Sequence, residues 1–157
     1  MVTIEKQREV VIKKREKVHE LRRKCEEQEN ASQTHAAESQ TLRREKQNLT
    51  RQLGLHEIRY EESRAALERH EQRLADSGRP GANGSFERNA RKEVEGRRIS
   101  CKETEDSIKA VDKLIKKADK GERKAQEKLS GLQDKLRDAN LHLRNEQGRL
   151  LQLRYRN

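Results

Sequence analysis

The chain has 157 residues, of which 29% are hydrophobic and 42% are charged, and only three residues are aromatic, namely Tyr60, Phe86 and Tyr155. This composition excludes an ordinary globular domain, whose core draws on about 45–50% apolar residues. Intrinsic disorder and long helices with a narrow apolar stripe both remain. The charges are mixed, with 38 basic and 28 acidic residues and a net charge of +10. Together with the abundant helix-forming residues, this mixture favours helices.

The N-terminal sequence, MVTIEKQREVVIKKREK, lacks the apolar segment of a secretory signal. No stretch of 18 apolar residues follows it, so we expect no membrane contact. Two cysteines without a signal peptide are typical of a reducing compartment. We therefore expect an intracellular protein, in the cytoplasm or on the cytoskeleton.

Residues 1–76 are predicted to form a first coiled-coil helix. Its heptad stripe is apolar near both ends and polar in the middle. One edge of this stripe reads Ile4, Val11, Val18, Cys25, Ser32, Ser39, Lys46, Leu53, Tyr60, Leu67 and Leu74. Because the stripe is interrupted, we expect this helix to need a partner.

Residues 77–85 are predicted to form a hairpin tip. Gly78 can adopt the left-handed conformation that ends a helix, and Pro80 cannot continue one. Ser85 is a predicted N-cap for a second helix, with Glu87 in the first turn. The alternative, one continuous helix in a parallel dimer, would have to accommodate Pro80 in its middle.

Residues 86–157 are predicted to form a second coiled-coil helix with a cleaner stripe. Thirteen of sixteen heptad positions from Cys101 to Leu153 are apolar. A strict seven-residue repeat of this length predicts a left-handed supercoil with a partner helix. The residues predicted to bind a partner helix are Ile108, Val111, Ile115, Leu129, Leu132, Leu136, Leu143, Leu150 and Leu153.

The fold class is therefore all-α, with two long helices in an antiparallel coiled-coil hairpin that belongs to a larger helical assembly. We expect Leu74 to face Ala90, which fixes the register along both helices. In this register Leu129, Leu132 and Leu136 face His35, Ser32 and Gln28. That mismatch indicates either a loose hairpin or a third helix from a partner. Cys25 and Cys101 would lie far apart, so no intrachain disulfide is expected.

Sequence motifs for chemistry are absent. Histidines on the first stripe are spaced too widely for a metal site, neither cysteine lies in a catalytic or CxxC pattern, and no phosphate-binding loop occurs. We expect no enzyme activity, no metal and no cofactor. The sequence RRIS, which ends at Ser100, resembles a basophilic kinase substrate, although a solvated helix serine is the simpler interpretation.

Positive charge gathers near the two ends of the chain. Residues 1–25 carry nine basic and four acidic side chains, and residues 135–157 carry six and two. A hairpin brings these segments together, which favours contact with a polyanion. The predicted polyanion-binding residues are Lys13, Lys14, Arg15, Arg22, Arg23, Lys24, Arg149, Arg154 and Arg156.

These features predict a structural or scaffold protein that binds partner helices and a polyanionic surface, for which a cytoskeletal filament such as tubulin is our first candidate. In architecture, though not by any motif, the chain is similar to coiled-coil scaffolds of cytoskeletal and axonemal assemblies. One alternative is an RNA-binding component of a ribonucleoprotein, which would bind RNA through its phosphates. A regulatory coiled-coil adaptor is another, and self-association is compatible with each.

Overall fold

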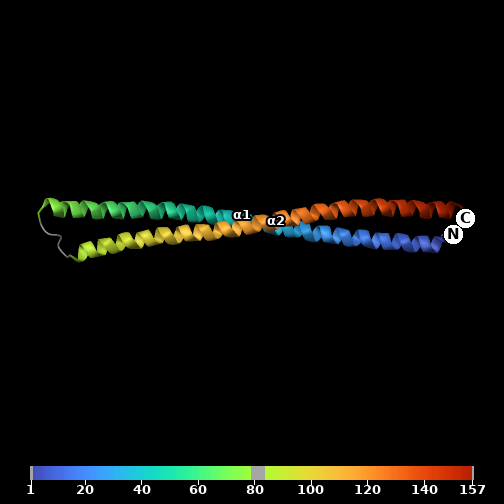
Figure 1. Cartoon of the computed structure of the whole chain (residues 1–157), viewed down its shortest axis with the longest axis horizontal. Coiled ribbons are helices and arrows are strands. Elements are labelled where there is room, and N and C mark those ends of the chain that lie inside the picture. Colours follow the sequence, from blue (N-terminus) through green and yellow to red (C-terminus); the bar gives the residue numbers. More distant parts are fainter. Residues whose placement is uncertain (1, 79–83, 157) are drawn as a thin grey trace. The chain divides into compact units, whose positions relative to one another are not determined.

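Two long helices make up the protein, as a computed structural model that describes residues 2–78 and 84–156 shows (Figure 1). Helix α1 spans Ile4–Asp76 and helix α2 spans Ser85–Arg156. The two helices pack against each other in opposite directions, so the predicted all-α helical hairpin is confirmed. No helix in the described residues is long and apolar enough to cross a membrane.

Both ends of α1 are capped by local hydrogen bonds. The amide of Lys6 donates to Oγ1 of Thr3 at 3.3 Å, which makes Thr3 the N-cap. At the other end Gly78 has a φ of 62°, and its amide donates to the carbonyl of Ala75 at 3.2 Å. The predicted role of Gly78 in ending the helix is therefore confirmed. Pro80 lies outside the described residues.

The start of α2 differs by one residue from the prediction. The amide of Arg88 donates to the carbonyl of Gly84 at 3.5 Å, so Gly84 occupies the N-cap position. Ser85 is the first residue of the helix rather than its cap. Glu87 lies in the first turn, where its charge opposes the positive end of the helix.

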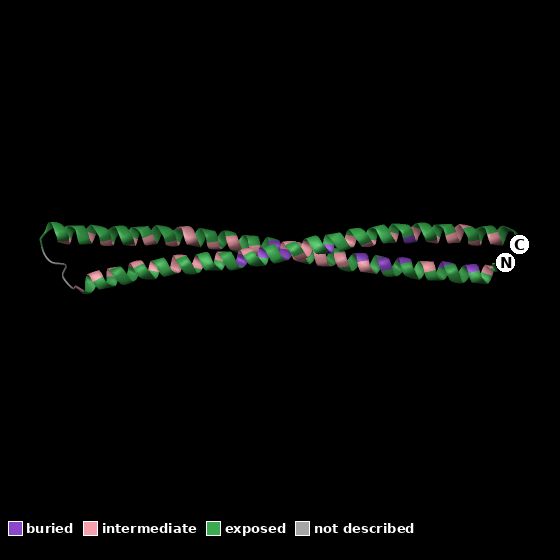
Figure 2. Ribbon diagram, in the orientation of Figure 1, coloured by how far each residue is buried: buried purple, intermediate pink, exposed green. Residues whose placement is uncertain are grey.

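Each helix contributes to two compact units. Unit 1 contains residues 2–38 and 117–156, and unit 2 contains residues 39–78 and 84–116. In both units the buried and half-buried side chains recur at alternating steps of three and four residues. Figure 2 shows these buried and half-buried residues as stripes along the helices. All sixteen heptad positions from Cys101 to Leu153 are buried or half-buried, as the period predicts.

Unit 1 has a small apolar core that both helices supply. Val18, Leu21 and Ala139 are its buried members, and Leu132, Leu136 and Leu143 pack against them while remaining partly exposed. Among the described residues no large side chain is completely buried. A seam of two helices therefore excludes water only in part, because each side chain is covered from one side.

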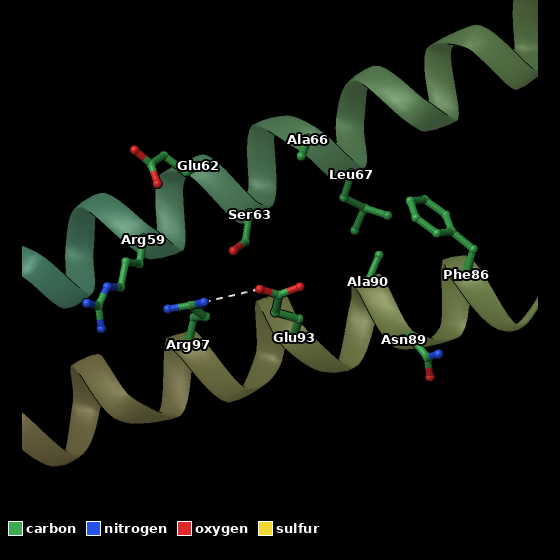
Figure 3. Close-up of a pocket in the computed structure, with 10 residues that line it drawn as sticks. All are labelled: Arg59, Glu62, Ser63, Ala66, Leu67, Phe86, Asn89, Ala90, Glu93 and Arg97. Atoms are coloured by element: carbon green, nitrogen blue, oxygen red, sulfur yellow. Dashed lines mark hydrogen bonds and ion pairs between the residues drawn. The ribbon is translucent and has the colours of Figure 1, made fainter.

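The register of the hairpin differs from the predicted one by about seven residues, which is one heptad. Ala90 lies opposite Leu67, as Figure 3 shows, rather than opposite Leu74. Elsewhere in unit 2, Lys46 pairs with Asp112 at 2.7 Å, whereas the predicted register placed Lys46 opposite Ala118.

The same displacement holds in unit 1. Gln7 donates from Nε2 to the carboxylate of Glu146 at 2.7 Å and to its carbonyl at 3.1 Å. The predicted register placed Gln7 at the last residue of the chain. A shift of one heptad keeps every stripe position on the stripe, so the apolar period alone does not distinguish the two registers.

The correct register removes the mismatch that the sequence predicted for Leu132 and Leu136. Leu132 and Leu136 pack against the Val18 and Leu21 cluster, not against Ser32 and Gln28. His35 instead lies on Gly121, where an added Cβ would be only 2.8–3.0 Å from three atoms of the imidazole ring. Nδ1 of His35 is buried there without a hydrogen-bond partner, 3.9 Å from the Glu38 carboxylate.

Candidate polyanion-binding surface

All nine predicted polyanion-binding residues lie in unit 1. Lys14 and Lys24 are half-buried, and the other seven are exposed. Three of the nine form ion pairs along their own helix. Arg23 pairs with Glu27 at 2.8 Å, Lys24 pairs with Glu20 at 2.8 Å, and Arg149 pairs with Glu146 at 2.9 Å.

A groove in unit 1 contains two of these predicted cations together with other basic residues. We call it the lysine groove, and it is lined by Lys14, Lys17, Glu20, Leu21 and Lys24 of α1 and by Lys135, Asp138, Ala139 and His142 of α2. Four lysines and a histidine thus surround two carboxylates. One carboxylate, Glu20, is already engaged by Lys24, whose hydrogen bond and charge hold the pKa of Glu20 below its ordinary value of 4.5.

A second hollow lies against α2 and carries arginines. Arg22 reaches it from α1, and Arg137, Asn140 and Arg144 line it from α2, together with Asp138 and Leu141. Arg137 is 3.9 Å from Asp134 on its own helix. The guanidinium groups present planar forks that suit carboxylate or phosphate groups.

A third hollow lies where the first and last described turns of unit 1 meet. Arg149 and Arg156 line it with Gln7, Gln152 and the apolar side chains of Val2 and Leu153. Five of the nine predicted cations are therefore distributed over these three hollows, whereas Lys13, Arg15, Arg23 and Arg154 line none of the three. Arg149 and Arg156 belong to this one, whereas Lys14 and Lys24 belong to the lysine groove.

The two units differ in how charge is balanced across the helices. In unit 2, Lys46 pairs with Asp112 at 2.7 Å and Arg91 pairs with Glu71 at 3.2 Å, each joining α1 to α2. Over residues 2–36 and 120–156, the described ion pairs join residues three or four apart on one helix. In the lysine groove, lysines of α1 and α2 lie on both sides of the seam and outnumber the two acids, Glu20 and Asp138.

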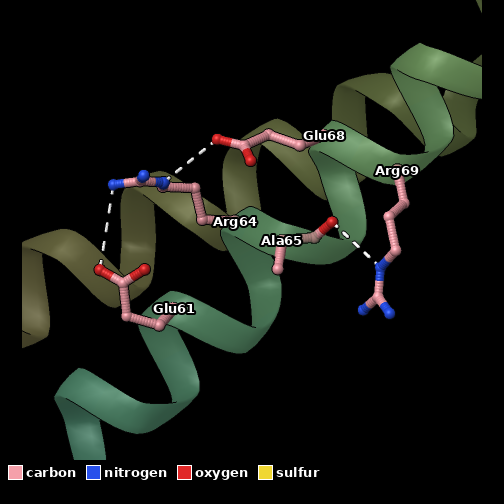
Figure 4. A network of polar contacts seen from close by, with 5 residues as sticks. All are labelled: Glu61, Arg64, Ala65, Glu68 and Arg69. Carbon is pink, nitrogen blue, oxygen red and sulfur yellow. Dashed lines mark hydrogen bonds and ion pairs between the residues drawn. The ribbon is translucent and has the colours of Figure 1, made fainter.

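Unit 2 also has arginines that pair with acids along one helix. Figure 4 shows Arg64 between two carboxylates of α1, 3.9 Å from Glu61 and 3.3 Å from Glu68. Arg98 makes two hydrogen bonds to Glu95, at 2.6 and 3.0 Å, which hold the pKa of Glu95 below 4.5. These pairs weaken the attraction of Arg64 and Arg98 for an external anion.

The hollow drawn in Figure 3 illustrates the balance in unit 2. Two arginines, Arg59 and Arg97, and two glutamates, Glu62 and Glu93, line it around Leu67 and Ala90. Arg97 and Glu93 form an ion pair at 3.2 Å. Phe86 at its end packs against His70, with ring centroids 4.7 Å apart. This hollow has no excess of positive charge.

The residues predicted to bind a partner helix face α1 in the hairpin. Val111 and Ile115 retain only 5% and 6% exposure, and Leu132, Leu136 and Leu143 pack on the core of unit 1. Ile108, Leu129, Leu150 and Leu153 are half-buried. A partner helix would therefore have to join the hairpin as a third helix, beside these side chains.

Ser100 lies inside α2, and its hydroxyl donates to the carbonyl of Gly96 at 3.0 Å. A kinase would have to unwind this part of the helix to use Ser100, so phosphorylation remains a prediction.

Cys25 and Cys101 are free thiols, the first buried and the second half-buried. Burial raises the pKa of the Cys101 thiol, and the carboxylates of Glu57 and Glu105 raise it further. Glu57 belongs to α1, which again supports the observed register, since the predicted neighbour of Cys101 was Ser63. Among the described residues, no group of histidine, cysteine and acidic side chains could hold a metal ion.

Sequence reasoning missed five basic residues of these hollows, namely Lys17, Lys135, Arg137, His142 and Arg144. All five lie in the basic segments 1–25 and 135–157, but each has only acidic or neutral residues as its direct neighbours in sequence, so local charge density did not single it out. Three of the five, Lys17, Lys135 and His142, could have been predicted from their heptad positions. Lys17 and Lys24 share one flanking position of the first repeat, and Lys135, His142 and Arg149 share the equivalent position of the second.

Comparison with protein families finds no family model that matches the chain. Comparison with curated proteins and with solved structures finds no significant match either.

Proposed function

We propose that this protein is a non-enzymatic structural protein whose basic unit 1 attaches it to a polyanionic surface. The observation that supports this most is the uneven treatment of charge along one hairpin. Unit 2 pairs cations with acids across its helices, whereas unit 1 sets cations of both helices beside one another in the lysine groove. Repulsion between like charges costs stability, which an external anion would offset.

An acidic cytoskeletal filament, such as tubulin, is our first candidate for the polyanion, in the cytoplasm. Exposed lysines and arginines attract acidic protein surfaces and nucleic acid phosphates by the same long-range field. Stacking on unpaired bases has little support, because the chain has only three aromatic residues. RNA binding through phosphates is therefore the alternative that an experiment has to separate.

The test is an affinity purification of the full chain from native lysate, with and without RNase, followed by mass spectrometry. The matched variants each lose four positive charges. The unit 1 variant carries Lys14→Gln, Arg22→Gln, Lys24→Gln and Lys135→Gln, and the unit 2 variant carries Lys92→Gln, Lys102→Gln, Lys109→Gln and Lys113→Gln.

We expect the native chain and the unit 2 variant to recover a filament protein in the presence of RNase, and the unit 1 variant to lose it. Recovery of RNA-binding proteins that RNase abolishes would transfer the function to ribonucleoprotein binding. Equal recovery by all three chains would contradict the role of unit 1.

A further inference from the structure

The lysine groove has a regular spacing that a general attraction to anions does not require. Lys17 and Lys24 are seven residues apart on α1, and Lys135 and His142 are seven residues apart on α2, with all four on the groove. Seven residues of helix rise about 10.5 Å. The same step continues along α2 to Arg149, which lines the neighbouring hollow. Basic residues from both helices therefore recur along the groove once per heptad.

This spacing separates an acidic helix from an extended acidic peptide. An extended peptide places side chains on one face every ~6.8 Å, whereas a helix with one acidic residue per heptad repeats every ~10.5 Å, in step with the basic residues of the groove. Three phosphate steps of a nucleic acid strand span ~10.2 Å, so the period does not exclude a nucleic acid. The partly exposed leucines beside the groove decide for a helix, because an amphipathic helix would cover them and a phosphate backbone would not.

The apolar seam beside the groove is only partly covered by the two helices. Leu21 and Ala139, which form the apolar part of the groove, belong to the core of unit 1. Leu132, Leu136 and Leu143 in the same core remain partly exposed, and no large side chain of the described residues is completely buried. A third helix would cover this seam and bring acidic side chains to the lysines.

We propose that the lysine groove binds an acidic α-helix of a partner coiled coil, whose Glu or Asp residues repeat every seven positions. This inference rests on the proposed function, because it specifies the anion that unit 1 recognises. The two carboxylates of the groove do not strongly oppose the binding of an acidic helix. Glu20 is held by Lys24, and Asp138 is the one remaining acid against Lys14, Lys17, Lys135 and His142.

Two designed helical peptides of about four heptads test the inference, with poly-L-glutamate as a third probe. The first peptide carries Glu at the positions flanking its apolar stripe. The second has the same composition and net charge, but its Glu residues lie on the outer face. Binding to the full chain is measured by fluorescence anisotropy at about 0.15 M salt, where exposed charges are screened beyond ~8 Å.

We expect the first peptide to bind at least about tenfold more tightly than the second. The double variant Lys24→Gln/Lys135→Gln should lose about tenfold in affinity for the first peptide. The matched variant Lys109→Gln/Lys113→Gln, in unit 2, should change it by less than about twofold. Circular dichroism of both variants checks that the hairpin is intact.

The outcomes separate this inference from the proposed function. Equal affinity for both peptides would overturn the heptad match but leave attachment to polyanions in place. Binding of poly-L-glutamate by a chain that binds neither peptide would have the same meaning. Absence of binding to all three probes would contradict both.

Discussion

The packing of His35 on Gly121 gives a direct test of the register through the substitution Gly121→Ala. Alanine is normally favoured over glycine inside a helix by about 1 kcal/mol. At Gly121, however, the new methyl group would lie 2.8 Å from Cε1, 2.9 Å from Nδ1 and 3.0 Å from Nε2 of the His35 ring. Overpacking of this kind costs about 1–3 kcal/mol. We therefore expect Gly121→Ala to change the free energy of unfolding by between about 0 and −2 kcal/mol.

Gly131 provides the matched control, because an added Cβ there meets nothing within 4 Å. Gly131→Ala should stabilise the hairpin by about 1 kcal/mol, which raises Tm by roughly 2–4 °C for a chain of this size. In a His35→Ala background the imidazole ring is absent, so Gly121→Ala should stabilise the helix as alanine normally does. The coupling energy of the double-mutant cycle should be about 1 kcal/mol or more.

The assay is urea unfolding followed by circular dichroism, at one chain concentration for all variants because self-association would shift the midpoint. A Gly121→Ala chain that gains as much stability as Gly131→Ala would refute the contact. It would show that His35 does not lie on Gly121, and the register described above would fail with it.

Three further predictions follow from the charges and thiols. Lys135→Glu introduces an acid into the lysine groove beside Lys24, so it should raise the free energy of unfolding by ~0.2–1 kcal/mol while weakening polyanion binding. A variant that loses both stability and polyanion binding would count against repulsion between the lysines of the groove. Cys101 should react with iodoacetamide more slowly than an unstructured cysteine at pH 8, because its raised pKa leaves less thiolate, and urea should abolish the difference. The pKa of Glu95 is depressed below 4.5 in the folded chain, so its contribution to stability is present above pH 4.5 and is lost as the pH falls through the folded pKa. Acid titrations should therefore show a smaller loss of helix in Glu95→Gln than in the native chain, and identical curves would argue against the Arg98 contact.

The sequence predicts the helices and their seam because both depend on local features. Alternation of apolar residues by three and four marks the buried stripe, and Gly78 marks the end of α1. Each of these signals is read within a few residues of the position that it describes.

Register could not be predicted in the same way. A seven-residue shift returns every stripe position to the stripe, so the pattern is degenerate, and the choice depends on pairs far apart in sequence. Lys46 with Asp112, and His35 with Gly121, are such pairs. The small size of Gly121, which leaves space for the His35 ring, was the available signal, and it favours the observed register.

The candidate site could be predicted in part for a related reason. Basic runs near the chain ends reveal that unit 1 is positive, but they do not show which cations share a groove. Lys135 and His142 join Lys24 only because the hairpin brings α2 beside α1. Their common heptad position carries this information only after a fold has been assumed.

The central claim is that the cations of unit 1, rather than the net charge of the chain, bind polyanions. Titration of fluorescent poly-L-glutamate with three chains tests it most directly: the native chain and the unit 1 and unit 2 variants, which have equal net charge. We predict that the unit 1 variant binds about tenfold more weakly than the native chain and that the unit 2 variant stays within about twofold of it. Equal weakening of both variants would contradict the claim, because it would show that net charge alone governs the attraction.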